Sequence, residues 1–154
     1  MADFLDVALI FDPETRTADA ELGEDGDLLL DETAFTPMLI SLGSDRRARP
    51  DDDLPEGRDA LNVSSSFVAR RGWAGDALDA YGKRIGSRLW LLERAKRHEL
   101  TELFAQDAAS EALRWAAVET GTPAQISASW PRRGLLALTS RVADLEFDFG
   151  VRGA

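Results

Sequence analysis

The 154-residue chain contains no cysteine and a single histidine, His98. Without cysteine it has no disulfide, thiolate metal site, iron–sulfur cluster or cysteine nucleophile. One histidine cannot build a multi-histidine metal site. His98 lies in the charged segment AKRHEL with no nucleophile motif around it, and we interpret it as a surface or helix-capping residue rather than a catalytic one. We expect no cofactor, no metal site and no catalytic residue.

Long apolar runs are also missing. The longest, residues 7–11 and 89–92, are far shorter than the roughly 20 residues that a membrane-spanning helix needs. The N-terminus, MADFLD, begins with acids where a secretory signal has bases followed by an apolar stretch. The sequence therefore predicts a soluble, non-exported protein without a membrane partner. Its 44% apolar content is enough for one domain, residues 1–154, with a sizeable core.

Bases are scarce in the first part of the chain. Residues 1–34 contain 11 acids and one base, while the rest holds 17 charges of each sign, so the N-terminal part carries the whole net charge of −10. This field repels phosphate backbones, so we expect no nucleic acid partner. The acidic segment either binds a basic partner or only keeps the protein soluble. Of the 18 bases 16 are arginine, the residue best suited to desolvated, bidentate pairs.

Apolar periodicity predicts strands at both ends of the chain and helices between them. The expected strands are 3–11, 28–30, 124–130 and 135–149, the last with a bulge or break near Ser140–Arg141. The expected helices run from a cap at Thr36, or one turn earlier at Asp31 or Thr33, to Gly43; from Gly86 onward; and from a cap at Thr101 to Gly121. The pattern indicates an α+β fold: a single small domain in which two or three helices pack on one mixed or antiparallel sheet, built from the first strand and the C-terminal hairpin.

Residues 44–76 have no periodicity and mix prolines, glycines and charges of both signs, which is typical of a long functional loop rather than packed core. Two arginine doublets each have acids beside them, which suits either a loop braced by arginine–carboxylate pairs or an interface anchor. The candidate partner-binding residues are Asp45, Arg46, Arg47, Arg49, Pro50, Arg70, Arg71, Trp73, Asp76, Arg88 and Trp90. We expect Arg46, Arg47, Arg71 and Trp73 to contribute little to folding of the isolated chain.

Two other site chemistries fit less well. Residues 21–32 superficially match a calcium-binding loop, but Glu21 stands where aspartate is expected and Gly23 offers no side-chain oxygen. The 28 acids allow many carboxylate pairs of the kind that cleave glycosidic bonds. Asp76 and Glu93 each have a tryptophan three residues before them, and an apolar surround is what keeps a general acid protonated. The glycan-cleaving interpretation stays open, although pairing with nearby arginines is the simpler role.

Three sequence blocks occur in order: LISLGSDRRARPDDDLP at 39–55, RRGWAGDAL at 70–78 and GSRLWLLERAK at 86–96. Together with Trp130 and the segment RRGLLALTSRV, they resemble the Mu-like phage baseplate wedge family over about residues 28–142. The first block is more distantly similar to the T-even-type baseplate wedge proteins that carry a lysozyme-like label.

The resemblance implies a non-enzymatic structural protein of a contractile phage tail or a phage-derived injection device. It implies several copies around the tail axis, gripped by other, larger wedge proteins through the loop arginines, and a sheet that offers a platform to the tail sheath protein of the first ring. The implied location is the virion baseplate, assembled in the host bacterial cytoplasm. The alternatives are a small lysozyme-like enzyme with paired carboxylates and an acidic host-interaction module without a tail.

The C-terminal strands carry one more expectation. No lysine follows Lys96 and no proline follows Pro131, although these residues usually protect an exposed strand edge. The resemblance implies that sheath subunits join by exchanging strands. We therefore expect a sheath strand to add at the edge near Val142, Leu145, Phe147 and Phe149, or to the N-terminal strand beside it. The alternative is that the acidic N-terminal segment covers this edge.

Overall fold

The computed structural model describes residues 4–12, 14–15, 17–55, 67–93 and 95–152. In these residues the main sheet is antiparallel, with strands in the order β5 (Gln125–Arg132), β6 (Leu135–Val142) and β7 (Leu145–Arg152). Two antiparallel ribbons pair β1 (Asp6–Val7) with β4 (Leu30–Asp31), and β2 (Leu9–Asp12) with β3 (Thr17–Ala20). The helices are α1 (Phe35–Gly43), α2 (Phe67–Arg70), α3 (Glu99–Ala112) and α4 (Trp115–Thr120), with two 3₁₀ helices, η1 (Ala74–Ala77) and η2 (Arg88–Leu92).

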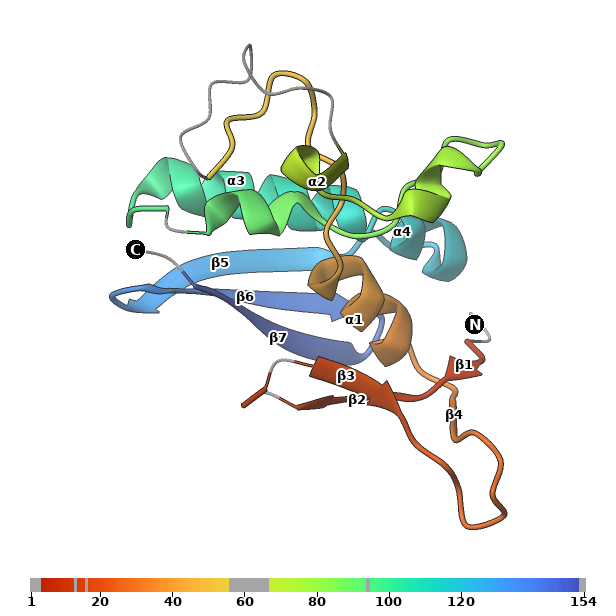
Figure 1. Cartoon of the computed structure of the whole chain (residues 1–154). Coiled ribbons are helices and arrows are strands. Elements are labelled where there is room, and N and C mark those ends of the chain that lie inside the picture. Colours follow the sequence, from red (N-terminus) through yellow and green to blue (C-terminus); the bar gives the residue numbers. More distant parts are fainter. Residues whose placement is uncertain (1–3, 13, 16, 56–66, 94, 153–154) are drawn as a thin grey trace.

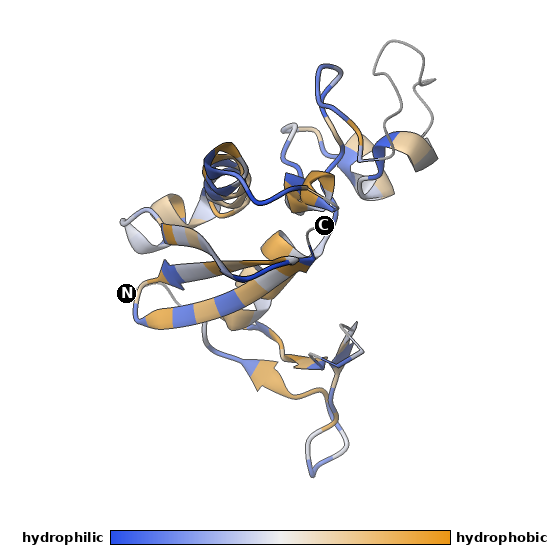
Figure 2. Cartoon of the chain, turned by 90° about the vertical axis from the view of Figure 1, so that its left-hand side faces the viewer, coloured by the Kyte–Doolittle hydropathy of each residue, from blue (hydrophilic) through white to orange (hydrophobic). Residues whose placement is uncertain are grey.

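The main sheet carries the core on one face, where α3 lies across β5 (Figure 1). The central strand β6 alternates strictly, with Leu136, Leu138, Ser140 and Val142 all buried. Successive side chains of a strand point to opposite faces, which explains the alternating apolar and polar bands along the strands in Figure 2. The two outer strands place buried apolar residues on the same face: Trp130, Phe147 and Val151.

α3 meets this face with small side chains. Ala105, Ala108, Ala109 and Ala112 are buried, and their spacing puts them on one side of the helix. Alanine lets the helix backbone approach the sheet closely. α1 fills the neighbouring space above β7, where Phe35 packs edge-to-face on Phe147 with ring centroids 5.3 Å apart.

Local signals decide where the helices begin and end. His98 caps α3, because its Nδ1 atom accepts the N–H of Leu100 at 3.1 Å, so its interpretation as a capping residue is confirmed. Before α1 the N-cap residue is Ala34, which has no side-chain acceptor to cap with, and Asp31 from β4 accepts the N–H of Thr36 through its Oδ2 atom at 2.9 Å. Gly121, with φ at 74°, ends α4 as expected.

Four of the expected helix details are wrong. Thr36 lies inside α1 instead of capping it, and Thr101 lies inside α3, which begins at Glu99. The helix expected from Thr101 to Gly121 is divided at Leu113–Arg114 into α3 and α4, since Leu113 turns into the core and is 1% exposed. The helix expected after Gly86 is the single 3₁₀ segment η2.

The N-terminal lobe, the described residues between 4 and 31, folds apart from the main sheet. The strand expected over 3–11 is divided at Ala8, whose N–H bonds the carbonyl of Leu29 at 2.8 Å. The Leu29 N–H in turn bonds the carbonyl of Glu21 at 2.9 Å, so Leu29 links the β1–β4 ribbon to the residue that follows β3. The acid-rich stretch also contains β3, which its composition did not predict. The expectation that the first strand joins the C-terminal hairpin in one sheet is therefore wrong, because nearby residues supply its partners.

The apolar run 135–149 contains a turn. β6 and β7 are joined by Ala143–Asp144, where Ala143 has a φ of 52°. The run is broken, as expected, but the break lies just beyond the predicted Ser140–Arg141, since both of those residues lie within β6. The irregularity in pairing occurs in β5, between Ser129 and Arg132.

The fold class is confirmed: a small α+β domain in which helices pack against antiparallel sheets. Among the described residues no helix is both long enough and apolar enough to cross a membrane.

Candidate functional site

The first arginine-bearing segment, residues 44–48, is held between two other segments of the chain. The Arg46 N–H bonds the Ser87 carbonyl and the Ser87 N–H bonds the Ser44 carbonyl, both at 2.9 Å. On the other side, the Ala48 N–H bonds the Arg70 carbonyl at 2.9 Å. These backbone hydrogen bonds give an irregular loop a defined path.

Two glycines allow this close packing. A Cβ atom on Gly86 would lie 2.6 Å from the Ser44 carbonyl oxygen, and one on Gly72 would lie 2.7 Å from the Cβ atom of Arg47. Both glycines have positive φ angles, 86° and 102°, and Arg71 beside Gly72 has a φ of 48°. A backbone in this region favours glycine strongly over other residues. Glycines in a polar segment suggest a loose loop, but here Gly72 and Gly86 let stretches of the chain pass in close contact. We call this region the chain crossing.

Arg88 lies at the centre of the charged network beneath this loop. Its side chain is 3% exposed, and it pairs with Asp52 and Glu111 at 2.9 Å and with Asp107 at 3.4 Å. The guanidinium also lies over the Phe104 ring, 5.3 Å from its centroid. A buried guanidinium requires such partners, because leaving its charge unpaired costs several kcal/mol.

Glu111 on α3 connects this centre to the loop. Its carboxylate pairs with Arg88, with Arg49 at 2.8 Å and with Arg46 at 3.4 Å. Burial alone would raise the pKa of Glu111, but the hydrogen bonds from Arg49 and Arg88 and the nearby positive charges lower that pKa to about 2. Glu111 is therefore ionised throughout the ordinary pH range.

Arg71 forms a second bridge at the surface. It reaches Asp45 at 3.0 Å, and its two terminal nitrogens meet the two oxygens of Glu93, both at 3.0 Å. The same guanidinium lies 4.5 Å from the ring centroid of Trp90, whose indole N–H bonds the Arg46 carbonyl at 2.8 Å. The expectation of arginine–carboxylate bracing is thereby confirmed for these residues, and Arg46 and Arg71 also have roles in the chain's own fold that we did not expect.

Part of the loop forms a small core of its own. Ala48 and Leu54 are buried together with Trp90. Arg70 is 7% exposed and donates hydrogen bonds to the backbone carbonyls of Arg49 and Pro50. The prediction that residues 44–76 lie outside packed core is therefore wrong for this part; residues 56–66 lie outside the described residues.

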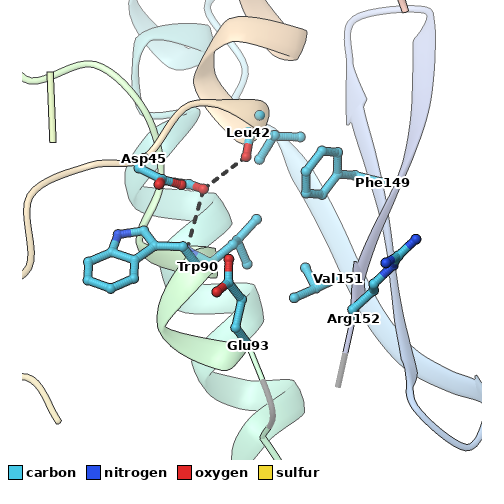
Figure 3. A pocket seen from close by; sticks show the side chains of 10 residues that line it. Leu42, Asp45, Trp90, Glu93, Phe149, Val151 and Arg152 are labelled. Atoms are coloured by element: carbon cyan, nitrogen blue, oxygen red, sulfur yellow. Dashed lines mark hydrogen bonds between the residues drawn. The ribbon is translucent and has the colours of Figure 1, made fainter. Parts of the chain in front are cut away.

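Two grooves flank the end of α1. The Trp73 groove, of about 660 Å³, is lined among others by Ile40, Asp45, Arg71, Trp73 and Ile85. The β7 groove, of about 320 Å³, lies between η2 and the end of β7, and Figure 3 shows Trp90 and Glu93 on one side and Phe149 and Val151 on the other. Gly43 and Asp45 line both grooves.

Trp73 is the most exposed aromatic side chain beside these grooves, at 54%. Its ring lies over Gly75, where any Cβ atom would be 2.3 Å from it. Asp76 follows Trp73 in η1, where one carboxylate oxygen accepts the Ile85 N–H at 3.1 Å and the other is buried without a hydrogen bond.

The candidate residues of the loop are thus brought together around η2 and α3. What sequence reasoning missed is their acidic counterpart on α3. Asp107 and Glu111 are four residues apart on one helix, and two like charges at that spacing destabilise a helix unless a cation lies between them. This four-residue spacing was the sequence feature that could have indicated a cation bound beside α3.

The predicted sheath-docking residues divide between two strands. Val142 belongs to the central strand β6 and is 1% exposed, so its placement at an edge is wrong. Leu145, Phe147 and Phe149 lie on β7, whose ladder partner among the described residues is β6 alone. Their side chains pack toward the core.

No group of metal-binding side chains occurs in the described part of the chain. The glycosidase interpretation needs one carboxyl group that stays protonated in an apolar surround. Glu93, one of its two candidates, instead shares the Arg71 guanidinium with Asp45.

The family described as phage protein GP46 matches residues 34–146. The baseplate protein gp46 of Escherichia phage Mu is 44% identical over 97 residues, which cover 62% of this chain and 59% of the Mu protein. The Mu-like prophage FluMu protein gp46 of Haemophilus influenzae is 36% identical over 115 residues, 72% of this chain and 68% of that protein. The chain thus spans less than two thirds of the Mu protein's length. No solved structure gives a significant match.

Replacing Glu111 by glutamine tests the charged network. We expect Glu111→Gln to lower the free energy of unfolding by about 2 to 4 kcal/mol at pH 7, because three arginines lose a shared carboxylate. The lowered pKa of Glu111 adds stability above its unfolded value of 4.5, and this is lost as the pH falls toward 2. Denaturant unfolding from pH 7 to 2 should show the two proteins converging below pH 4.5. A constant difference across this range would contradict the assignment, and the exposed Glu119→Gln is the matched control.

Gly72 and Gly82 form a matched pair for the chain crossing. Both have positive φ angles, but a Cβ atom on Gly82 would have no neighbour within 4 Å. We expect Gly82→Ala to lower stability by only about 1 kcal/mol, the cost of the backbone conformation. Gly72→Ala should cost at least about 2 kcal/mol more, since it adds a steric clash with Arg47. Equal losses in thermal or denaturant unfolding would show that the crossing is loose.

Proposed function

The chain belongs to the phage protein GP46 family, and we propose that it is a baseplate component of a Mu-like contractile phage tail or of an injection device derived from one. The family predicted from the three sequence blocks is confirmed. The relative from phage Mu is named a baseplate protein, and 44% identity over 97 residues supports the same role here. In this proposal the protein resides in the virion tail, in several copies around its axis, after assembly in the host cytoplasm.

The observation that carries the proposal is the braced loop with an exposed tryptophan on it. The loop's position is determined by buried ion pairs and backbone hydrogen bonds, so it presents its outer surface without first having to become ordered. Trp73 is half exposed beside a groove large enough for a partner's side chains. Tryptophan and arginine are the residues that dominate interface energies.

We assign this surface to the larger wedge proteins. Asp45, Arg71 and Trp73 line the Trp73 groove and are the proposed direct contacts. Arg88 and Trp90 are buried and act by holding the loop in place. This division refines the partner-binding set predicted from sequence, in which all these residues had the same role.

For the sheath, we propose that β7 receives an added strand. Val142 and Leu145 close a two-residue turn, so the N–H groups of Leu145, Phe147 and Phe149 face β6. The N–H groups of Glu146 and Asp148 then face outward, where an added strand would bond them. The side chains of Phe149 and Val151 line the β7 groove, which such a strand's inward residues could enter. The β2–β3 ribbon forms no ladder with β7.

A structural component of a tail needs no catalytic activity, and we propose that the protein is not an enzyme. The buried carboxylates of the loop region serve as counter-ions to arginine, which is the role that bracing requires. Catalysis by paired carboxylates would require one of them to act as an acid.

Replacing Trp73 by alanine tests the wedge interface. We expect Trp73→Ala to leave the melting temperature within about 3 °C of wild type, since the ring is half exposed, while lowering affinity for the purified larger wedge protein at least about tenfold. Tyr81→Ala is the control, because Tyr81 is 87% exposed in the segment that follows. Unchanged binding by a folded Trp73→Ala protein would exclude this surface, and a large loss of stability would make Trp73 a folding residue.

Replacing Asp148 by proline tests the sheath edge. Proline removes one outward-facing N–H of β7, whereas proline at Leu145 would instead open the β6–β7 turn. We expect Asp148→Pro to reduce the fraction of baseplates that carry sheath in electron micrographs at least about tenfold. Asp148→Ala is the control, because it also loses the 2.7 Å hydrogen bond from Thr139 but keeps the N–H. Normal sheath attachment by a folded Asp148→Pro protein would argue against β7 as the docking edge.

A further inference from the structure

The N-terminal lobe exposes an apolar face. Val7 stands opposite Leu30, and Leu22 stands opposite Leu28. Residues opposite each other on antiparallel strands share a face, as do residues two apart on one strand. Leu22, Leu28 and Leu30 therefore share one face of the lobe, and Leu5 extends it beyond Val7.

This leucine face is open to solvent. Leu5 is 69% exposed, Leu22 65%, Leu30 56% and Leu28 45%. The lobe is attached to the core by other residues, among them Leu9 and Phe11, which pack against the main cluster. A small ribbon normally turns its apolar face inward, and a contiguous exposed apolar face on a small protein marks an interaction surface.

Acids surround the leucine face. Glu21, Glu24, Asp25 and Asp27 are exposed and belong to the same hairpin as Leu22 and Leu28. Residues 1–34 carry 11 acids and one base, whereas the rest of the chain is neutral. The lobe thus combines apolar contact area with a strongly negative rim.

This combination selects among partners. Two copies joined through the leucine face would bring two acidic rims together, which like-charge repulsion opposes. Nucleic acids and anionic lipid surfaces are repelled for the same reason. The complementary surface is a protein patch of apolar side chains with lysine or arginine around it.

We propose that the leucine face docks such a basic-rimmed apolar patch of another tail protein. The site is separate from the Trp73 groove and from β7. It also lies wholly outside residues 34–146, the part that matches the family. The inference rests on the proposed function, because it takes the partner to be a component of the same particle.

Hydrogen exchange on assembled tails and on the free chain tests this docking. We expect peptides covering residues 20–31 to exchange at least about tenfold more slowly in purified tails than in the isolated protein, with peptides covering α4 unchanged. Carbodiimide, which joins a carboxylate to a lysine in direct contact, should link Glu24, Asp25 or Asp27 to a different tail protein. If the protein is present in tails but its N-terminal lobe exchanges as fast as in the free protein, the docking inference is wrong and the proposed function still stands. A chain absent from tails would overturn both the inference and the proposed function.

Variants provide a second readout. The double variant Leu22→Gln, Leu28→Gln should lower the number of copies per tail, measured by quantitative mass spectrometry, at least tenfold. The control is Leu100→Gln, Leu103→Gln, which alters two leucines of α3 that are 68% and 53% exposed. The variant Glu24→Gln, Asp25→Asn leaves the apolar residues in place and keeps the Asp25 oxygen that accepts the Asp27 N–H at 3.2 Å. It should also lower incorporation, and normal incorporation of both lobe variants would overturn the proposal.

Discussion

A guanidinium shielded from water has to be neutralised by the protein around it, and the arrangement of the middle of this chain follows from that requirement at Arg88. Its three carboxylate partners come from the loop and from α3, so satisfying one side chain draws two distant segments together. Apolar burial alone would hold this loop weakly, since its own cluster contains only a few side chains. The charges specify which loop residues face the helix, and the apolar residues fill the space that remains.

Sequence periodicity predicted the fold class because α3 and the C-terminal strands have a strongly apolar face each. Periodicity could not predict which strands belong to the same sheet. The local hydrogen bonds of Ala8 and Leu29 exclude the first strand from the main sheet, and no feature of residues 3–11 indicates which partner their backbone takes. The break in the run 135–149 was placed a few residues before the turn at Ala143, because alanine rarely adopts a positive φ and the sequence there carries no glycine or asparagine to mark the turn.

The sequence predicted which residue types make up the candidate site, but it did not predict the role of each residue. Clustered arginines and acids indicated ion pairing, and the pairs are present. Which arginine would be buried depends on long-range packing: Arg88 is enclosed by carboxylates from the loop and from α3, whereas Arg49, which pairs with the same Glu111, is 51% exposed. Residue type alone therefore cannot separate a side chain that contacts a partner from one that positions it. That distinction needs the exposed fraction of each side chain.

The two grooves beside α1 share Gly43 and Asp45, and this has a mechanical consequence. A tail that contracts puts its attachment points under load. In the proposed arrangement, a pull on the edge of β7 would pass to the Trp73 side through the short, hydrogen-bonded stretch from the end of α1 to Arg46. Stiffness along this path would let a displacement at one groove arrive at the other nearly undiminished, so the domain can act as a rigid coupling between whatever it holds on its two sides.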